Sequence, residues 1–119
     1  MSFKTLSVEN KNFLLINDDI NLTTVEDALE IIANVWYTTE CDKVIIKKSQ
    51  LNPDFFELKT GFAGEVLQKF STYNIKLGIA GDFDVTNSKS LRDFIYESNK
   101  RRKVVFADTI EQAVELLED

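Results

Sequence analysis

Residues 75–80 read Ile-Lys-Leu-Gly-Ile-Ala, a short segment that is nearly all apolar. A run of this length and composition is typical of a strand that is buried on both faces of a parallel sheet. A turn-forming loop, Gly81-Asp82-Phe83-Asp84, follows it directly, and a stretch with helical spacing of apolar residues precedes it. This segment therefore predicts the central strand of an α/β fold, flanked by helices.

The rest of the chain continues the same alternation of strand-like and helix-like patterns. Strands are expected at residues 3–9, 12–17, 43–48 and 104–106, and helices at residues 25–39, 53–70, 88–99 and 109–117. Asn10-Lys11 suits a tight turn between the first two strands. The order β-β-α-β-α-β-α-β-α predicts a mixed, mainly parallel five-stranded sheet with four helices. One domain over residues 1–119 is expected.

Several helix starts carry recognisable capping patterns. Thr23–Glu26, Ser90–Asp93 and Thr109–Gln112 each have the spacing of a capping box. Asn52-Pro53-Asp54 places Pro at a first helical position and an acid in the first turn. The second helix can either run unbroken from Pro53 to Phe70 or break before Thr60, and both possibilities remain open from the sequence.

Composition narrows the possible functions. The 119 residues include 14 basic and 20 acidic side chains, so the net charge is −6 and general binding to nucleic acid is not expected. The chain has no His, and its one Cys, Cys41, excludes a disulfide framework and a Cys-based zinc site. No dinucleotide or P-loop fingerprint occurs, so no cofactor is expected. Neither a signal peptide nor a membrane span of about 18 apolar residues is present, which predicts a cytoplasmic protein.

The order and spacing of these elements resemble the STAS domain, the sulphate transporter and anti-sigma factor antagonist family. The likeness extends from about Lys4 to Leu117, and Thr60-Gly61 stands where that family has a Ser-Gly pair at a helix start. The family's usual Asp-Ser-Ser-Gly reads Leu58-Lys59-Thr60-Gly61 here. The resemblance implies a STAS-like fold and a regulatory module that binds a protein partner. In such regulators a partner kinase phosphorylates the matching hydroxyl and so blocks binding.

Two longer segments resemble a narrower group. Residues 55–65, with 67–70, and residues 88–99 are similar to a small bacterial family of unknown function, whose members are stand-alone proteins of about this length. This resemblance implies no activity. It differs at Lys100-Arg101-Arg102, where that family tends to have a Gly that stops the helix.

The first candidate site lies around Thr60, with Lys59, Gly61 and Gly64 beside it. Thr60 is either a helix cap or a phosphorylation site in a contact surface, because a phosphate adds about −1.5 to −2 charges. Gly61 and Gly64 lie three residues apart, which suggests that a backbone, a partner's or the protein's own, comes close to them. Of these two, close packing within the protein is the favoured interpretation.

The second candidate site follows the central strand. Ligands favour the carboxyl ends of strands in parallel sheets, which draws attention to Asp82 and Asp84. A metal held by these two and by Asp18 and Asp19 is a weaker hypothesis, since no complete ligand motif appears. The helix start at Ser88, Lys89 and Ser90 offers either an anion seat or an ordinary cap. Lys100-Arg101-Arg102-Lys103 either complements a helix end or docks an acidic partner.

Two functions follow. The leading hypothesis is a non-enzymatic protein-interaction module that uses the Thr60 region, since no His is present to serve Ser-His or Cys-His catalysis. The alternative is a small enzyme or metabolite-binding protein that uses Asp82, Asp84, Ser88 and Glu97. A homodimer through the edge strand at residues 3–9 is compatible with either. A pocket holding two of the carboxylates favours the alternative, and a flat surface of small residues around Thr60 favours the module.

Overall fold

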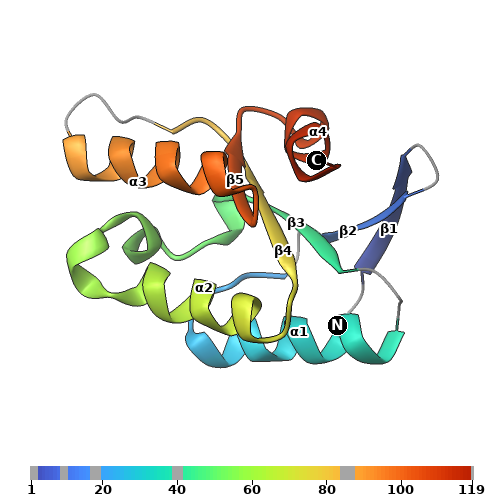
Figure 1. Cartoon of the computed structure of the whole chain (residues 1–119). Helices are drawn as coiled ribbons and strands as arrows, with labels where there is room; N and C mark the ends of the chain where they lie inside the picture. Colours follow the sequence, from blue (N-terminus) through green and yellow to red (C-terminus); the bar gives the residue numbers. More distant parts are fainter. Residues whose placement is uncertain (1–2, 9–10, 17–19, 39–41, 84–87, 119) are drawn as a thin grey trace.

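The computed structural model describes residues 3–8, 11–16, 20–38, 42–83 and 88–118 (Figure 1). The strands are β1 (Phe3–Val8), β2 (Lys11–Ile16), β3 (Lys43–Lys47), β4 (Lys76–Ala80) and β5 (Val104–Ala107). The helices are α1 (Val25–Thr38), α2 (Phe62–Thr72), α3 (Lys89–Arg101) and α4 (Ile110–Glu118). Three short 3-10 turns, Lys48–Gln50, Pro53–Phe56 and Leu58–Thr60, lead from β3 to α2. The predicted turn at Asn10, and Cys41, fall outside the described residues.

The strands lie side by side in their order along the chain. β2, β3, β4 and β5 are parallel neighbours, and β1 pairs antiparallel with β2 at one edge. The α/β class, the four α-helices and the mainly parallel character of the sheet confirm these parts of the prediction. No helix in the described part of the chain is long and apolar enough to cross a membrane.

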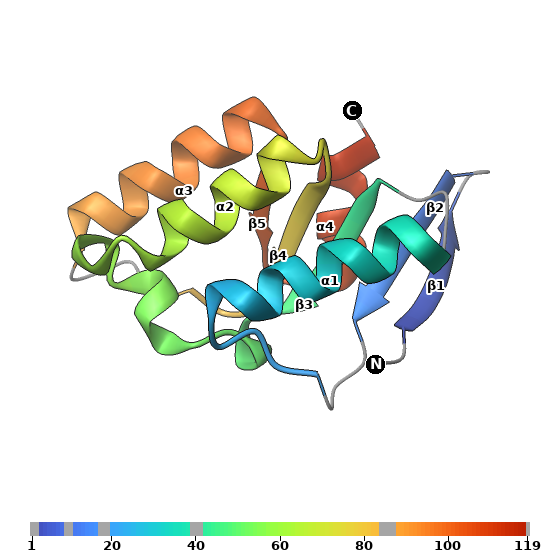
Figure 2. The same cartoon turned by 90° about the horizontal axis from the view of Figure 1, so that it is seen from below.

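The strand order determines which face each helix covers. When consecutive parallel strands are neighbours, right-handed crossovers place every connecting helix on the same face of the sheet. Figures 1 and 2 show α1, α2 and α3 on one side and α4 on the other. Because both faces are covered, β4 is buried from Leu77 to Ala80, as the apolar segment predicted.

Two apolar cores result from this arrangement. The larger one joins the inner faces of α1 and α2 to alternate residues of the strands, among them Leu14, Val44, Ile46, Leu77 and Ile79. The smaller one joins Phe13, Ile45 and Val105 to the inner face of α4, at Ala113, Val114 and Leu117. Successive side chains of a strand point to opposite faces of the sheet, so neighbouring residues of each strand enter different cores.

Gly78 is the position where α4 lies closest to the sheet. A Cβ atom added there would lie 3.1 Å from Leu117 Cδ1 and 3.2 Å from Ala113 Cβ. A side chain at this position would push the helix away from β4. Glycine in the middle of this central strand therefore allows the last helix to seal the second face.

The cap of α1 differs from the predicted capping box. Asp27, rather than Glu26, closes the first turn, because its Oδ2 accepts hydrogen bonds from the backbone N–H groups of Thr23 (2.9 Å) and Thr24 (3.1 Å). Asp27 N–H in turn donates to Thr24 Oγ1 at 3.2 Å. Burial would raise the pKa of Asp27, but the hydrogen bonds from Thr23 and Thr24 outweigh it and lower that pKa.

The predicted second helix breaks before Thr60. Pro53–Phe56 and Leu58–Thr60 form separate 3-10 turns, and α2 begins only at Phe62. Asn52 opens the first of these turns, since its side chain accepts a hydrogen bond from Asp54 N–H at 3.0 Å. Phe55 is fully buried in the larger core. The two 3-10 turns therefore carry the chain from the end of β3 to α2 with this ring inside the core.

The helix start at Thr109 matches its predicted capping box in part, because the Thr109 hydroxyl caps Gln112 N–H but the Gln112 side chain bonds Asp108 N–H and not Thr109 N–H. Gln112 N–H donates to Thr109 Oγ1 at 3.1 Å, and Gln112 Oε1 accepts from Asp108 N–H at 3.1 Å. Two backbone donors at the start of α4 are satisfied in this way.

Candidate functional site

A cleft of about 990 Å³ opens at the carboxyl ends of β3, β4 and β5. Its apolar lining residues are Leu51, Pro53, Phe56, Ala80, Phe83, Leu91 and Ile110, and its polar ones are Lys47, Lys48, Ser49, Asp82, Asp108 and Thr109, with Gly81 between them. Three consecutive strands end here and their loops diverge toward α2, α3 and α4. This is the edge of an α/β sheet at which ligands most often bind.

A buried glutamine shapes the loop after β3. Gln50 is only 3% exposed, its Oε1 accepts from Lys47 N–H at 2.9 Å, and its Nε2 donates to the Ile20 carbonyl at 2.8 Å. Leu22 N–H donates to the Gln50 carbonyl at 2.7 Å. The segment before α1 and the segment after β3 are thereby joined, which holds Lys48 and Ser49 at the mouth of the cleft.

Lys48 crosses from the end of β3 to the loop after β4. Its Nζ donates to the Asp82 carbonyl at 2.5 Å and lies 5.7 Å and 5.5 Å from the ring centres of Phe56 and Phe83. A Cβ atom at Gly81 would lie 2.5 Å from Lys48 Cβ. Glycine at position 81 therefore allows the lysine stem to pass directly over the backbone that ends β4.

The residues predicted near the strand end are only partly brought together. Asp82 lines the cleft and is exposed, whereas Asp84, like Asp18 and Asp19, lies outside the described residues. Among the described residues, no group of three Asp, Glu, Cys or His side chains could hold a metal ion. Asp108 also lines the cleft, and the strand-end rule identifies it because it directly follows β5.

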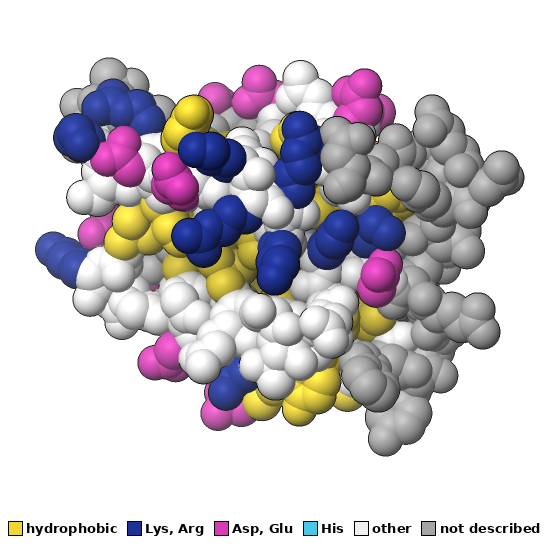
Figure 3. All heavy atoms as spheres, viewed as in Figure 1, with side chains coloured by type: hydrophobic (Ala, Val, Ile, Leu, Met, Phe, Trp, Pro, Cys, Tyr) yellow, Lys and Arg dark blue, Asp and Glu magenta, His cyan; other side chains and the backbone are white. Residues whose placement is uncertain are grey.

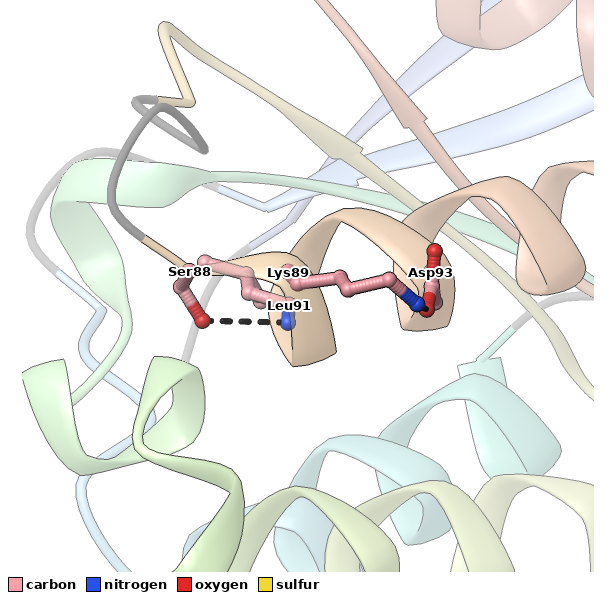
Figure 4. Close-up of polar contacts among 4 residues, drawn as sticks. All are labelled: Ser88, Lys89, Leu91 and Asp93. Carbon is pink, nitrogen blue, oxygen red and sulfur yellow. Dashed lines mark hydrogen bonds and ion pairs between the residues drawn. The ribbon is translucent and has the colours of Figure 1, made fainter.

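The start of α3 is an ordinary helix start (Figure 4). Ser88 is its N-cap and accepts a hydrogen bond from Leu91 N–H at 3.1 Å, so the predicted Ser90–Asp93 box is wrong. Asp93 instead pairs with Lys89, one helical turn away, at 2.9 Å. Lys89 and Ser90 are exposed and do not line the cleft, and from this helix start only Leu91 does.

The Thr60 hydroxyl is engaged within its own loop. It lies 2.9 Å from the Glu57 carbonyl and 3.1 Å from the Asp54 carbonyl, and it accepts from Phe62 N–H at 3.2 Å. Thr60 thus closes the last 3-10 turn and satisfies the first N–H group of α2. The side chain is exposed, as is that of Lys59.

The favoured interpretation of Gly61 and Gly64, close packing within the protein, is wrong, and the approach of a partner's backbone stays a prediction. A Cβ atom at either position would meet nothing within 4 Å, so no backbone among the described residues packs against them. Gly61 has a φ of +78°, which favours glycine, because it turns the chain into α2. Gly64 lies exposed in the first turns of that helix.

Both candidate sites share one segment of chain. Pro53 and Phe56 line the cleft, and the Asp54 carbonyl lies in contact with the Thr60 hydroxyl. Residues 53–60 therefore contribute to both the cleft and the Thr60 surface.

A family model described as a domain of unknown function, DUF4180, matches residues 8–117. The chain belongs to the DUF4180 family. This confirms the expected membership of a family of unknown function. No curated protein and no solved structure matches the chain.

In this DUF4180 chain the basic run Lys100–Lys103 ends α3 and leads into β5. Arg102 is the C-cap of α3 and takes the left-handed conformation, with a φ of +60°, within the segment Lys100-Arg101-Arg102 that stands where the narrower family tends to have a Gly. One of its guanidinium nitrogens donates to the Leu116 carbonyl at 3.3 Å, near the end of α4. A cation at a helix carboxyl end is favourable, so Arg102 has a structural role.

Lysines also begin β3 and β4, at Lys43 and Lys76, and a third, Lys103, directly precedes β5. Lys43 pairs in register with Lys76, and Lys103 is next to Lys76 because its carbonyl accepts from Leu77 N–H at 3.0 Å. Figure 3 shows Lys and Arg side chains gathered across the middle of one face of the molecule. The docking of an acidic partner on this basic surface stays a prediction.

Proposed function

We propose that this DUF4180 protein is a non-enzymatic binding protein whose cleft at the ends of β3, β4 and β5 takes a small molecule. The observation that carries the proposal is the cleft itself. Its volume of about 990 Å³ is at the upper end of small-molecule sites, which span about 300–1,000 Å³. Apolar side chains with a few convergent polar groups form its lining, as such sites require.

The lining favours binding over catalysis. The chain has no His, so the Ser-His and Cys-His pairs that activate nucleophiles are absent from it. The two described carboxylates of the cleft, Asp82 and Asp108, are exposed.

A tryptophan that fills the cleft tests this function. Ser49 is exposed and lines the cleft, so Ser49→Trp adds bulk there without removing a core contact. Native mass spectrometry of protein purified from its own source should show a retained small molecule in the wild type and none in Ser49→Trp. Ser71→Trp, on the exposed side of α2, is the matched control and should retain the molecule.

A thermal-shift screen of metabolites is the second measurement. A compound at about 100 times its Kd stabilises the folded state by about 2.7 kcal/mol, and this stabilisation should be lost only in Ser49→Trp. Equal retention and equal shifts in the wild type and both variants would contradict the proposal.

A second candidate function is a STAS-like regulatory module that binds a protein through the Thr60 surface. Its support is the exposed patch of Thr60, Gly61 and Gly64, with open space above both glycines. The order of strands and helices is compatible with a STAS-like arrangement, which is part of this proposal. A phosphate on Thr60 would replace the hydroxyl hydrogen that faces the Glu57 and Asp54 carbonyls and would add negative charge to the patch.

Affinity capture from the protein's own lysate tests this second function. Thr60→Glu should lose a partner that the wild type retains, whereas Ser49→Trp should retain it. A partner bound equally by Thr60→Glu and the wild type would remove Thr60 from the interface.

A further inference from the structure

Lys48 carries a positive charge that no described carboxylate neutralises. Its described polar partners are the Asp82 carbonyl and the rings of Phe56 and Phe83. The carbonyl and the rings orient the ammonium but leave its full charge in place. The side chain is half-buried, so water screens this charge less than it screens an exposed one.

The negative charges of the cleft lie farther out. Asp82 and Asp108 are both exposed, and Asp82 turns its backbone carbonyl, not its carboxylate, to Lys48. The interior of the cleft therefore combines a half-buried cation with apolar walls. An ammonium has three donors, and the Asp82 carbonyl takes one of them, which leaves donors for a bound anion.

Apolar groups surround the ammonium. The rings of Phe56 and Phe83 are 5.6 Å apart between centres, and Leu51, Leu91 and Ile110 complete the walls. An ion made only of polar atoms would leave these walls without contacts. A molecule with an apolar body and one acidic group would satisfy both the walls and the cation.

We propose, building on the small-molecule function above, that the cleft selects organic anions, and that Lys48 is the residue that determines this specificity. The ligand class is an aromatic or aliphatic body that carries one carboxylate, sulfonate or similar acidic group. The ammonium of Lys48 contacts the acidic group, and the side chains of the walls contact the body. A purely structural role, in which Lys48 only ties the Asp82 loop to β3, is the alternative that the experiment must separate.

Two fluorescent probes that differ by one charged group provide the test. 8-Anilinonaphthalene-1-sulfonate and N-phenyl-1-naphthylamine share the same rings, and only the first carries a sulfonate. The wild type should bind the sulfonate about tenfold more tightly than the neutral probe, as a charge-assisted contact in a half-buried site predicts. Ser49→Trp should weaken the binding of both probes, and this result would show that they bind in the cleft.

Substitutions at Lys48 separate specificity from structure. Lys48→Met keeps an apolar stem but removes the charge. It should lower the affinity for the sulfonate probe about tenfold and leave the affinity for the neutral probe unchanged. Lys48→Arg should retain the preference. Lys59→Met removes an exposed lysine that does not line the cleft and should change neither probe.

Salt dependence of the wild type keeps the test valid if Lys48→Met does not fold. Raising the NaCl concentration from about 0.05 to 0.5 M should weaken the binding of the sulfonate probe but not that of the neutral probe, because salt screens only the ionic contact. Equal affinities for the two probes, or a sulfonate affinity unchanged in Lys48→Met, would overturn the anion specificity but leave the binding function standing. Absence of binding by either probe would overturn both.

Discussion

Gly61 and Gly64 are both exposed and three residues apart, yet only one of them has to be glycine. Gly61 adopts a φ of +78°, a left-handed conformation that L side chains rarely take. Gly64 lies within α2 with open space where a Cβ would be. There glycine leaves the helix less stable than alanine would, by about 1 kcal/mol.

Alanine at these two positions should change stability in opposite directions. Gly61→Ala should lower the free energy of unfolding by about 1 kcal/mol, because the residue is strained in the turn before α2. Gly64→Ala should raise it by about 0.5–1 kcal/mol through helix propensity. Urea unfolding of both variants measures the two values. A stabilising Gly61→Ala would contradict the conformational argument.

At the scale of the element, the first turn of α1 depends on one carboxylate. Asp27 and Glu26 are adjacent acids, but only Asp27 accepts from the N–H groups of Thr23 and Thr24. Since these bonds favour the charged form, the pKa of Asp27 is lower in the folded protein than in the unfolded chain. The resulting stability is fully present above the ordinary Asp pKa of about 3.9 and is lost as pH falls through the lowered value.

Asp27→Ala should therefore lower the free energy of unfolding by about 1 kcal/mol at pH 7, the usual effect of losing a helix cap. The difference from the wild type should shrink as pH falls below about 3.9, because protonation of Asp27 weakens the same bonds. Urea unfolding at a series of pH values measures it. Glu26→Ala is the matched control and should change the free energy of unfolding little at any pH. An equal loss of stability in Glu26→Ala would contradict the role of Asp27 and favour the capping box that the spacing predicted.

At the scale of the whole molecule, one edge of the sheet is closed by a side chain. β5 is the last strand of the sheet. The side-chain amide of Asn99 makes hydrogen bonds with both the N–H and the carbonyl group of Phe106. Phe106 N–H donates to Asn99 Oδ1 at 2.7 Å, and Asn99 Nδ2 donates to the Phe106 carbonyl at 3.1 Å. α3 is thereby attached to the edge that an added strand would otherwise use.

Asn99→Ala should lower the free energy of unfolding by about 2 kcal/mol, since two hydrogen bonds of about 1 kcal/mol each are lost. Ser98→Ala, at the preceding position of α3, is the control and should change stability by less than about 0.5 kcal/mol. Chemical unfolding provides both numbers. Equal effects at the two positions would show that Asn99 does not hold the edge.

Local patterns explain why so much of the architecture was predictable. Hydrophobic spacing identifies each strand and helix, because residues two or about 3.6 apart share a face whatever the rest of the chain does. The alternation of strands and helices then predicts a mainly parallel sheet, and the strand-end rule draws attention to Asp82, which lines the cleft. These features depend on neighbours in the sequence.

What depended on distant residues could not be predicted in this way. The 3-10 turns before α2 place Phe55 in a core that other elements form. Lys48 meets the carbonyl of Asp82, 34 positions along the chain, and Gln50 meets that of Ile20. The sequence alone therefore determined the elements and their order, because hydrophobic periodicity is local. Only the tertiary structure decided that a cation lies in an apolar cleft, because that contact exists only once β3 and β4 are paired.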